Sequence, residues 1–399
     1  MADGTSGSLA GIKVVDLSRV LAGPYCTQML ADHGASVIKV EPPQGDETRE
    51  WGPPFNEGQS AYFAGINRNK RSIVIDLREP SGSAVVLRLL KSGDVLVHNF
   101  KPGAMERWGL GYDAVLRERF PRLVVCHISG FGVDGPLGGL PGYDAAVQAM
   151  TGLMSVNGAP NGGPMRMGTP IVDIGTGLIA SSAILAALIE RSRSGIGQAI
   201  DVPLFDSALS LLHPQAANAL MSNKVPVATG NAHPNIVPYD MFHTRTRPIF
   251  LAIGNNGQFA KLCEVLGIPS VPADPRFVDN RNRLQNREEL TKILSDRFSQ
   301  VDGEELEPQL LLLGVPAGAV RTVTEALAHP QTAHRRMVIA KDGYRGTGIA
   351  ASMSRTPGSV RSRPPAFGAD SIEILREIGY AEKEIETLIS SHVVKQAPS

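Results

Sequence analysis

The length and composition describe an ordinary globular protein that is too long for one hydrophobic core. The chain has 399 residues, and single cores stop growing near ~250–300 residues. Lysine plus arginine and aspartate plus glutamate both number 39, so no net charge favours a nucleic acid or a membrane as partner. Three widely spaced cysteines without a Cys-x-x-Cys pair argue against a disulfide framework or a zinc ribbon, and they favour a reducing compartment.

Two stretches bear on the location of the protein. The first eight residues are polar and lack the apolar core of an export signal. The apolar run from Ile174 to Ile189 is shorter than the ~20 residues of a membrane span, and it contains glycine, serine and threonine. We therefore expect a protein of the cytoplasm, or of an organelle matrix in a eukaryote, with the apolar run as a buried core helix.

Strands and helices alternate along the first ~200 residues, as is typical of an α/β domain. A helix that ends near Asp32 separates the first two strands, which is the spacing of a βαβ unit in a parallel sheet. The fingerprint G-x-G-x-x-G is absent from the first turn, so we expect no dinucleotide site of that kind. The predicted strands are 13–17, 36–41, 72–77, 94–99 and 123–128.

The composition changes after a helical stretch over 206–221. Loop-like residues follow, then a strand over 249–253 and helices near 285–300 and 304–313, which together indicate a second, smaller α/β unit. The last part of the chain holds strand-like pieces and two helices, and we expect it to return to the first domain. The predicted domains are therefore 1–224 and 331–399 for the large one and 225–330 for the small one.

One carboxylate, Asp173, occupies a conspicuous place in the sequence. A strand-like segment ends at it, small residues follow at 175–177, and an apolar helix then runs to cations and Gly195, which are C-terminal signals. Asp173 is thus predicted at or just before a helix N-terminus, where free N–H groups and the helix dipole favour an anion. Two interpretations remain: a helix cap, or a reactive carboxylate to which the glycines give a substrate close access.

Other sites and chemistries find little support. The nine histidines form neither H-E-x-x-H nor paired ligand spacing, so we expect no metal site. The sequence has no G-x-S-x-G elbow, which argues against a hydrolase. Its glycine-rich loops lack a lysine at Walker spacing, which argues against a nucleotide triphosphatase. His127 lies in a predicted buried strand and fits a hydrogen-bonded core histidine better than a base. Three cations within 68–71, beside a strand, form either a solvated face or a phosphate site.

The order and spacing of several motifs resemble the class III coenzyme A transferases, the formyl-CoA and crotonobetainyl-CoA transferase family. The resemblance runs from Leu9 to about Val394, which is nearly the whole chain. The motifs are Arg19-Val-Leu-Ala-Gly-Pro24, Gly34-Ala-Ser-Val-Ile-Lys-Val-Glu41, Asn67-Arg-Asn-Lys-Arg-Ser72, Asn99-Phe-Lys-Pro-Gly103, Gly142-Tyr-Asp144 and the stretch around Asp173.

The resemblance implies a Rossmann-like large domain, a small domain and an interlocked homodimer. It also implies that Asp173 attacks an acyl-CoA thioester and carries CoA as an aspartyl thioester to a carboxylic acid, without a bound cofactor or metal. Tyr143 is implied to lie beside the thioester. The other implied CoA contacts are Leu21, Ala22, Ile75, Asp76, Leu77, Arg78, Asn99, Phe100, Lys101 and Arg107.

Departures from the family pattern indicate a branch. Oxalate-using members carry glutamine where Leu21 stands and arginine where Pro42 stands, and their tetraglycine flap is absent here. The segments Gly230–Tyr239 and Gly254–Gly257 take its place and are similar to the succinyl-CoA:dicarboxylate branch, which includes succinate–hydroxymethylglutarate and glutarate-type transferases. In that branch His233 would contact the distal carboxylate or the surroundings of the nucleophile; otherwise it is a solvated loop histidine.

Two rival functions share the fold. An α-methylacyl-CoA racemase of this family places a histidine in the Gly-x-Asp turn, whereas this chain has Tyr143, and a phenol with a pKa near ~10 is a poor base at neutral pH. A catalytically inert CoA-binding protein is the second rival, and the presence of Asp173 argues against it.

Overall fold

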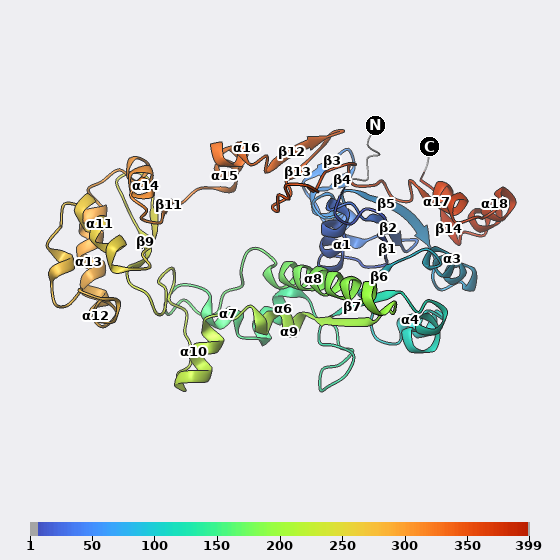
Figure 1. Ribbon diagram of the computed structural model, residues 1–399, viewed down its shortest axis with the longest axis horizontal. Helices are drawn as coiled ribbons and strands as arrows, with labels where there is room; N and C mark the ends of the chain where they lie inside the picture. Colours follow the sequence, from blue (N-terminus) through green and yellow to red (C-terminus); the bar gives the residue numbers. More distant parts are fainter. Residues whose placement is uncertain (1–6, 398–399) are drawn as a thin grey trace. The chain divides into compact units, whose positions relative to one another are not determined.

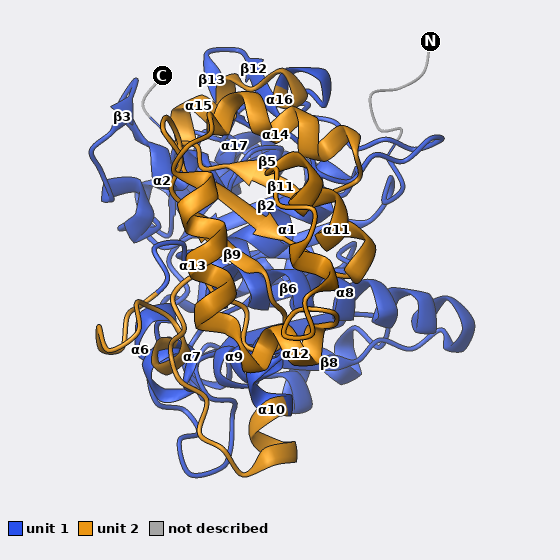
Figure 2. Cartoon of the chain, turned by 90° about the vertical axis from the view of Figure 1, so that its left-hand side faces the viewer, with its two compact units in different colours: residues 1–153, 167–217, 333–399 blue, residues 154–166, 218–332 orange. Residues whose placement is uncertain are grey.

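The computed structural model describes residues 7–397 (Figure 1). The chain divides into two compact units, of which unit 1 holds both ends of the chain and unit 2 most of its middle (Figure 2). Unit 1 comprises 1–153, 167–217 and 333–399, and unit 2 comprises 154–166 and 218–332. The predicted boundaries lay at 224/225 and 330/331, and the prediction had no separate segment 154–166.

Unit 1 is built on one seven-stranded sheet, in the order β14-β5-β2-β1-β6-β7-β8. All neighbouring strands are parallel except β14, which pairs antiparallel with β5. The predicted α/β fold with a parallel sheet is therefore confirmed. The strands are β1 (Lys13–Asp16), β2 (Ser36–Glu41), β5 (Lys70–Ile75), β6 (Val95–His98), β7 (Val124–Ser129), β8 (Ala199–Pro203) and β14 (Val394–Lys395).

The strand order reverses between β1 and β6. From β1 the chain first builds outward through β2 and β5, then crosses back to add β6, β7 and β8 on the other side. The loops that leave β1 and β6 therefore diverge at the carboxyl ends of adjacent strands. Such a switch point opens a crevice in which ligands of α/β sheets bind.

Helices cover both faces of this sheet. Val15 and Leu96 point into one hydrophobic cluster with α3 (Pro80–Leu90), while their neighbours Val14 and Val97 point into the other. This alternation explains why the strands are apolar throughout, because each residue is buried on one face or the other. Figure 1 shows α1 and α8 side by side, and they line the second cluster. The covering helices are α1 (Ala22–Asp32), α3, α8 (Ile171–Ser194), α17 (Ser371–Glu377) and α18 (Glu382–Ser390).

Helix α8 begins earlier than the sequence suggests. It starts at Ile171 after Pro170, so Asp173 is its third residue, and the predicted strand before Asp173 is wrong. The β-branched residues Ile171 and Val172 favour a strand locally, but a tertiary hydrogen bond from the Val172 N–H to Asp144 supports a helical start. The predicted C-terminus is confirmed: Gly195 caps the helix with φ of 78°.

By length and composition alone, α8 is long and apolar enough to cross a membrane. Its inner side, with Ala180 and Ile184, is fully buried in the second cluster. This is the behaviour of the core helix of a globular unit, as the sequence predicted. Its outer side carries several exposed apolar residues.

The glycines of α8 admit neighbouring chain segments. A Cβ at Gly177 would lie 2.8 Å from the carbonyl oxygen of Ala22, and one at Gly175 would lie 2.6 Å from the Leu211 side chain. The expectation that these glycines leave room for a substrate is therefore corrected. They allow the N-terminal end of α1 and the end of α9 (Leu204–Ser210) to pack closely on α8.

Unit 2 has its own core around a small antiparallel sheet in the order β11-β10-β9. The largest buried side chains include Phe259, Phe277 and Phe298, which come from its helices and loops. The segment Gly254–Gly257 leads into α11, which Asn255 caps through the N–H of Gln258. The elements are β9 (Tyr239–Phe242), β10 (Ile249–Ala252), β11 (Ala317–Ala319), α11 (Asn256–Val265), η3 (Val271–Ala273), α12 (Asn280–Gln285), α13 (Arg287–Phe298), α14 (Gly303–Leu312) and α15 (Val323–Ala328).

The remaining elements are short. They are η1 (Glu47–Glu50), β3 (Phe55–Asn56), β4 (Gln59–Ser60), α2 (Ala61–Ala64), α4 (Ala104–Arg107), η2 (Tyr112–Leu116), α5 (Arg117–Arg119), α6 (Asp144–Met150), α7 (Leu153–Val156), α9 (Leu204–Ser210), α10 (Gln215–Ser222), α16 (Pro330–His334), β12 (Val338–Lys341) and β13 (Tyr344–Thr347).

The close approach of α1 and α8 gives a test of this packing. We expect Gly177→Ala to lower the free energy of unfolding by roughly 1–3 kcal/mol, because its methyl group displaces the Ala22 backbone. Ser182→Ala, exposed on the same helix, should change it by less than about 0.5 kcal/mol. Thermal and denaturant unfolding measure both variants, and equal stability of the two would refute the packing role of Gly177.

Candidate active site

A cavity of about 370 Å³ in unit 1 collects most of the residues that the resemblance implied. It lies where the loops after β1 and β6 separate, and it also reaches the glycine loop after β7. Arg19 and Glu47 line it as well. The implied residues in its wall are Leu21, Ala22, Asn99, Phe100, Lys101, Arg107, Tyr143 and Asp173.

A second cavity of about 200 Å³ holds the remaining implied residues of unit 1. It shares Arg19 and Phe100 with the first cavity, so the two lie on either side of these side chains. Pro42 is part of its wall. Two neighbouring hollows suit an elongated ligand better than a compact one. The implied residues here are Ile75, Asp76, Leu77 and Arg78.

The carboxylate that caps α8 is Asp144, which precedes it by 29 residues. Its Oδ2 atom accepts the N–H groups of Val172 at 2.8 Å and of Asp173 at 3.1 Å, and its Oδ1 atom accepts the side-chain amide of Gln148. No side chain at the N-cap position makes a capping hydrogen bond. The helix-cap interpretation of Asp173 is therefore wrong. Asp173 lines the cavity, and its carboxyl group does not serve the helix end.

The environment of Asp173 favours its neutral form. Burial raises the pKa of Asp173 to about 7, and the nearby negative charge of Asp144 adds to the effect. The expectation that a helix N-terminus would keep this carboxylate ionised is thus corrected, since Asp144 already takes the first N–H groups of the helix. Near neutral pH the two protonation states of Asp173 are of comparable population.

Tyr62 lies close enough to this pair to feel both charges. Its pKa is raised to about 12, first by burial and then by the negative charges of Asp173 and Asp144. The phenol is consequently a proton-bearing group near the cavity at all physiological pH values.

Neither Tyr62 nor Asp144 was identified from the sequence as a site residue. An aspartate directly after Tyr143 was visible in the Gly-x-Asp turn, but its capping contact is not a sequence signal.

Arg19 is the cation that both cavities share. One guanidinium nitrogen lies 3.2 Å from Glu47, while the buried Nε has no hydrogen-bond partner among the described residues. A buried donor without a partner is costly, and a ligand oxygen would satisfy it. Together with Lys101 and Arg107 it makes the first cavity suitable for an anionic ligand. In the sequence, Arg19 is distinguished only as the first residue of a family motif.

The cations at 68–71 do not form an anion site. Arg68 pairs with Asp32 at 2.6 Å, Lys70 with Asp16 at 3.0 Å, and Arg71 with Glu377 at 2.8 Å. Arg68 and Lys70 are buried. Because these two side chains are buried and paired, the solvated-face and phosphate-site interpretations are both wrong for them. Their carboxylate partners come from distant parts of the chain.

The two histidines singled out from the sequence have different places. His127 has Nε2 at 2.9 Å from the carbonyl oxygen of Phe100 and Nδ1 at 3.1 Å from Asp201, which confirms a hydrogen-bonded core histidine. His233 belongs to unit 2, where its Nδ1 accepts the N–H of Asn235 at 3.1 Å. Burial, and then Arg287, lower its pKa. The proposed contact of His233 with a substrate stays a prediction.

Metal chemistry finds no support in the part of the chain that the structure describes. Residues 7–397 contain no group of three or more histidine, cysteine, aspartate or glutamate side chains placed to hold a metal ion.

Comparison with known proteins identifies the family. The model of CoA-transferase family III matches residues 9–371. The chain belongs to this family. It is 42% identical to the succinate–glutarate CoA-transferase of Agrobacterium fabrum, over 94% of this chain and 96% of that protein. It is 40% identical to the human succinyl-CoA:glutarate CoA-transferase, over 97% of this chain and 90% of that protein.

A solved structure shows the same fold. The CAIB/BAIF family protein of Brucella suis superposes with a TM-score of 0.84 at 43% identity, and the match covers 94% of this chain and 100% of that one. The protein is thus a class III CoA-transferase, whose family acts on CoA thioesters. The two cavities in unit 1 and the carboxyl group of Asp173 are accordingly the parts of the molecule where this chemistry is to be sought.

The raised pKa of Asp173 makes stability depend on pH. Its folded pKa of about 7 exceeds the ordinary 3.8, so ionisation opposes folding, and the penalty grows as the pH rises from about 4 to above 7. Asp173→Asn removes this penalty. We expect the variant to be more stable than the parent by about 1–4 kcal/mol at pH 8 and by less at pH 5.

Thermal unfolding of both proteins between pH 5 and pH 8 measures the difference. Asp113→Asn is the control, because Asp113 has an exposed side chain in the same unit. A stability difference for Asp173→Asn that does not grow with pH would contradict the raised pKa.

Proposed function

We propose that this transferase moves CoA from succinyl-CoA to a dicarboxylic acid through a covalent thioester on Asp173. The observation that carries the proposal is a half-buried carboxyl group in the cavity wall that is released from helix capping by Asp144. The names of the Agrobacterium and human relatives support succinate and glutarate as the kind of acids exchanged.

The reaction is an exchange of acyl groups in which each bond broken is matched by one formed. An Asp173 oxygen attacks the carbonyl carbon of succinyl-CoA and the C–S bond breaks. CoA departs as the thiolate, and a mixed anhydride of Asp173 and succinate is formed. The thiolate attacks the Asp173 carbonyl carbon and releases succinate, which gives the aspartyl-CoA thioester. An acceptor carboxylate then repeats these steps in reverse order. No redox step or net proton transfer occurs.

The surroundings of Asp173 suit these steps. A pKa of about 7 leaves an ionised fraction at neutral pH, and burial removes the water that would hydrolyse the anhydride. Helix α1 begins at Ala22 in the cavity wall without a side-chain cap, so its first N–H groups are a source of donors for the developing oxyanion. Arg19, Lys101 and Arg107 supply positive charge for the phosphates of CoA.

The choice of acceptor rests on the branch of the family. Leu21 and Pro42 replace the glutamine and arginine of oxalate-using members, and both line the cavities. We therefore propose a longer dicarboxylate of the glutarate type, and the family branch makes His233 the candidate partner of its distal carboxylate. One methylene changes binding by only ~1–3 kcal/mol, so discrimination among neighbouring acids is a matter of degree.

The mass of the protein after incubation with succinyl-CoA alone tests the nucleophile. We expect an adduct equal to CoA minus water in the parent protein and none in Asp173→Ala, because only an aspartyl thioester gives this mass. Asp113→Ala, with an exposed side chain, should retain the adduct. Added glutarate should discharge it faster than butyrate does.

Two other outcomes would overturn the proposal. Absence of the adduct together with α-proton exchange in deuterated water on a branched acyl-CoA would identify the racemase. Absence of both signals, with CoA still bound, would leave an inert CoA-binding protein.

We also infer that the protein is a homodimer, interlocked as the family resemblance implies. The outer face of α8 supports this: Leu178, Leu185 and Ile189 recur at helical spacing and are 42%, 37% and 62% exposed. An exposed apolar stripe of this kind marks an interaction surface in a globular protein.

The three cysteines are free and buried, which supports a reducing, cytoplasmic location.

Substitution in the apolar face of α8 tests the dimer. We expect the parent protein to sediment as two 42.5 kDa chains and Leu185→Glu to fail to assemble into dimers as it folds, because a charge would be buried in the contact. Lys383→Glu, exposed on α18, is the control and should remain dimeric. A monomeric parent protein, or a Leu185→Glu variant that remains fully dimeric, would contradict this interface. Interlocked subunits should also fail to exchange between tagged and untagged dimers until the protein is unfolded.

A further inference from the structure

The turn between β1 and α1 contains a strained residue. Val20 has φ of 71°, and it is the only β-branched residue among the described non-glycine residues with positive φ. This left-handed conformation is sterically unfavourable for a β-branched side chain. The turn is part of the first cavity, since Arg19, Val20, Leu21 and Ala22 all line it. Strain that is retained at a ligand cavity calls for an interaction that holds it.

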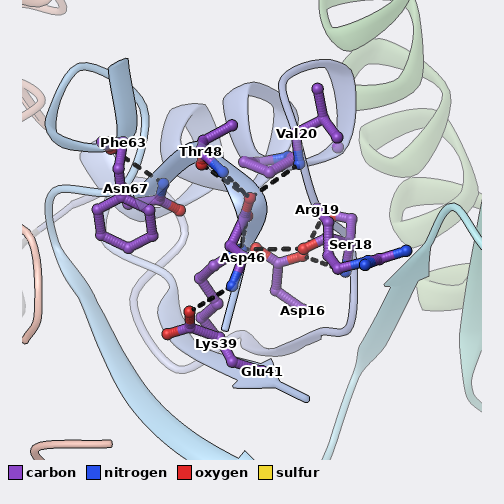
Figure 3. A network of polar contacts seen from close by, with 12 residues as sticks. Asp16, Ser18, Arg19, Val20, Lys39, Glu41, Asp46, Thr48, Phe63 and Asn67 are labelled. Atoms are coloured by element: carbon purple, nitrogen blue, oxygen red, sulfur yellow. Dashed lines mark hydrogen bonds and ion pairs between the residues drawn. The ribbon is translucent and has the colours of Figure 1, made fainter. Parts of the chain in front are cut away.

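Side chains from three other segments hold the backbone of this turn (Figure 3). The N–H groups of Ser18, Arg19 and Val20 donate in succession to Asp16 at 3.0 Å, to Asn99 at 3.0 Å and to Asp46 at 3.3 Å. The Ser18 carbonyl oxygen accepts Lys39 Nζ at 2.9 Å, and the Arg19 carbonyl oxygen accepts the Asn99 amide at 2.7 Å. The turn is thus fixed by side chains rather than by regular secondary structure.

Asp46 and Lys39 form the buried part of this arrangement. They pair at 2.8 Å, and both side chains are fully buried. Burial opposes ionisation of Asp46, but Lys39 and the bonds from Thr48 hold its pKa below the ordinary value. The pair therefore remains charged, with Asp46 bound to the Val20 N–H and Lys39 to the Ser18 carbonyl oxygen. Its two partners lie on either side of Arg19.

A buried ion pair is poor evidence for stabilisation, because the cost of removing two charges from water offsets their attraction. Hydrophobic residues of similar size are often neutral or better at such a place. The contacts of Lys39 and Asp46 with consecutive parts of a strained turn indicate a more specific use. Arg68 and Asp32 form a comparable buried pair, whose other hydrogen bonds include those to Gln28, Asn69 and Thr347, away from this turn.

We propose that Asp46 is a positioning residue which, with Lys39, holds the left-handed turn at Val20 so that Leu21 and Ala22 face the CoA thioester. The proposal rests on the proposed function only in taking CoA as the ligand of the cavity. Loss of the pair lets Val20 relax to a negative φ, which moves the start of α1 away from the position that the ligand requires. Neither residue touches the reacting atoms.

The test replaces the pair and measures the affinity for CoA by calorimetry. We expect Lys39→Met combined with Asp46→Leu to weaken CoA binding about tenfold or more, with similar thermal stability. Adding Val20→Gly should restore most of the affinity, because glycine adopts positive φ without strain. Val20→Ala should restore much less, since it removes the methyl groups but retains a Cβ.

The matched control replaces the other buried pair, as Arg68→Met with Asp32→Leu, and should leave CoA affinity within about twofold of the parent protein. If the first double variant does not fold, Asp46→Asn takes its place, with an expected loss of about threefold that Val20→Gly again reduces. An equal loss of affinity with valine or glycine at position 20, or an equal loss in the control, would overturn the proposal. Because binding is measured directly, these results do not depend on whether the protein transfers CoA, which the Asp173 adduct decides separately.

Discussion

The hydrogen bonds from the start of α8 to Asp144 are the constraint on which the site depends. A helix N-terminus exposes unpaired N–H groups, and an aspartate in its first turn normally satisfies them itself. Here Asp144, on α6, accepts the N–H groups of Val172 and Asp173 instead. This contact starts the helix before Asp173, fixes α6 against α8, and leaves the Asp173 carboxyl group in the cavity wall. Burial is the main cause of the raised pKa of Asp173, and the contact adds to it, because a second negative charge is close and the first N–H groups of the helix are occupied.

Side chains from elsewhere in unit 1 also bind the backbone N–H groups at the start of the other helix of the site, α1. At α1 the N–H groups before the helix are taken by Asp16, Asn99 and Asp46, while the helix itself begins uncapped at the cavity. Gly177 lets this end of α1 approach α8 closely. The two helix starts are therefore set against each other by backbone contacts, and the position of Leu21 and Ala22 relative to Asp173 is determined by packing within unit 1 rather than by a flexible loop.

The sequence predicts the regular parts of this arrangement well. Apolar runs gave the five strands 13–17 to 123–128 within a few residues, and Gly195 gave the end of α8, because these depend on local pattern. The start of α8 could not be predicted, since Ile171 and Val172 favour a strand locally and the helical start depends on Asp144 binding the N–H groups of Val172 and Asp173. For the same reason the partners of Arg68 and Lys70 were hidden: Asp32 and Asp16 are distant in sequence. The local sequence shows that a side chain is charged, but it does not show which distant carboxylate will pair with it in the folded protein.

Site residues show the same division between pattern and placement. Motif resemblance named Asp173 and twelve binding residues, eleven of which come with Asp173 to two cavities that share Arg19 and Phe100. It did not name Arg19 or Tyr62 as site residues. Arg19 is distinguished by a buried Nε without a partner among the described residues. Tyr62 is distinguished by a pKa that burial and the nearby Asp173 raise. Both are consequences of burial, and burial magnifies electrostatic interactions that composition cannot weigh. A carboxyl group whose pKa is raised, as that of Asp173 is, therefore depends on tertiary contacts, because only they can remove water and donors from one aspartate while leaving its neighbour hydrogen-bonded.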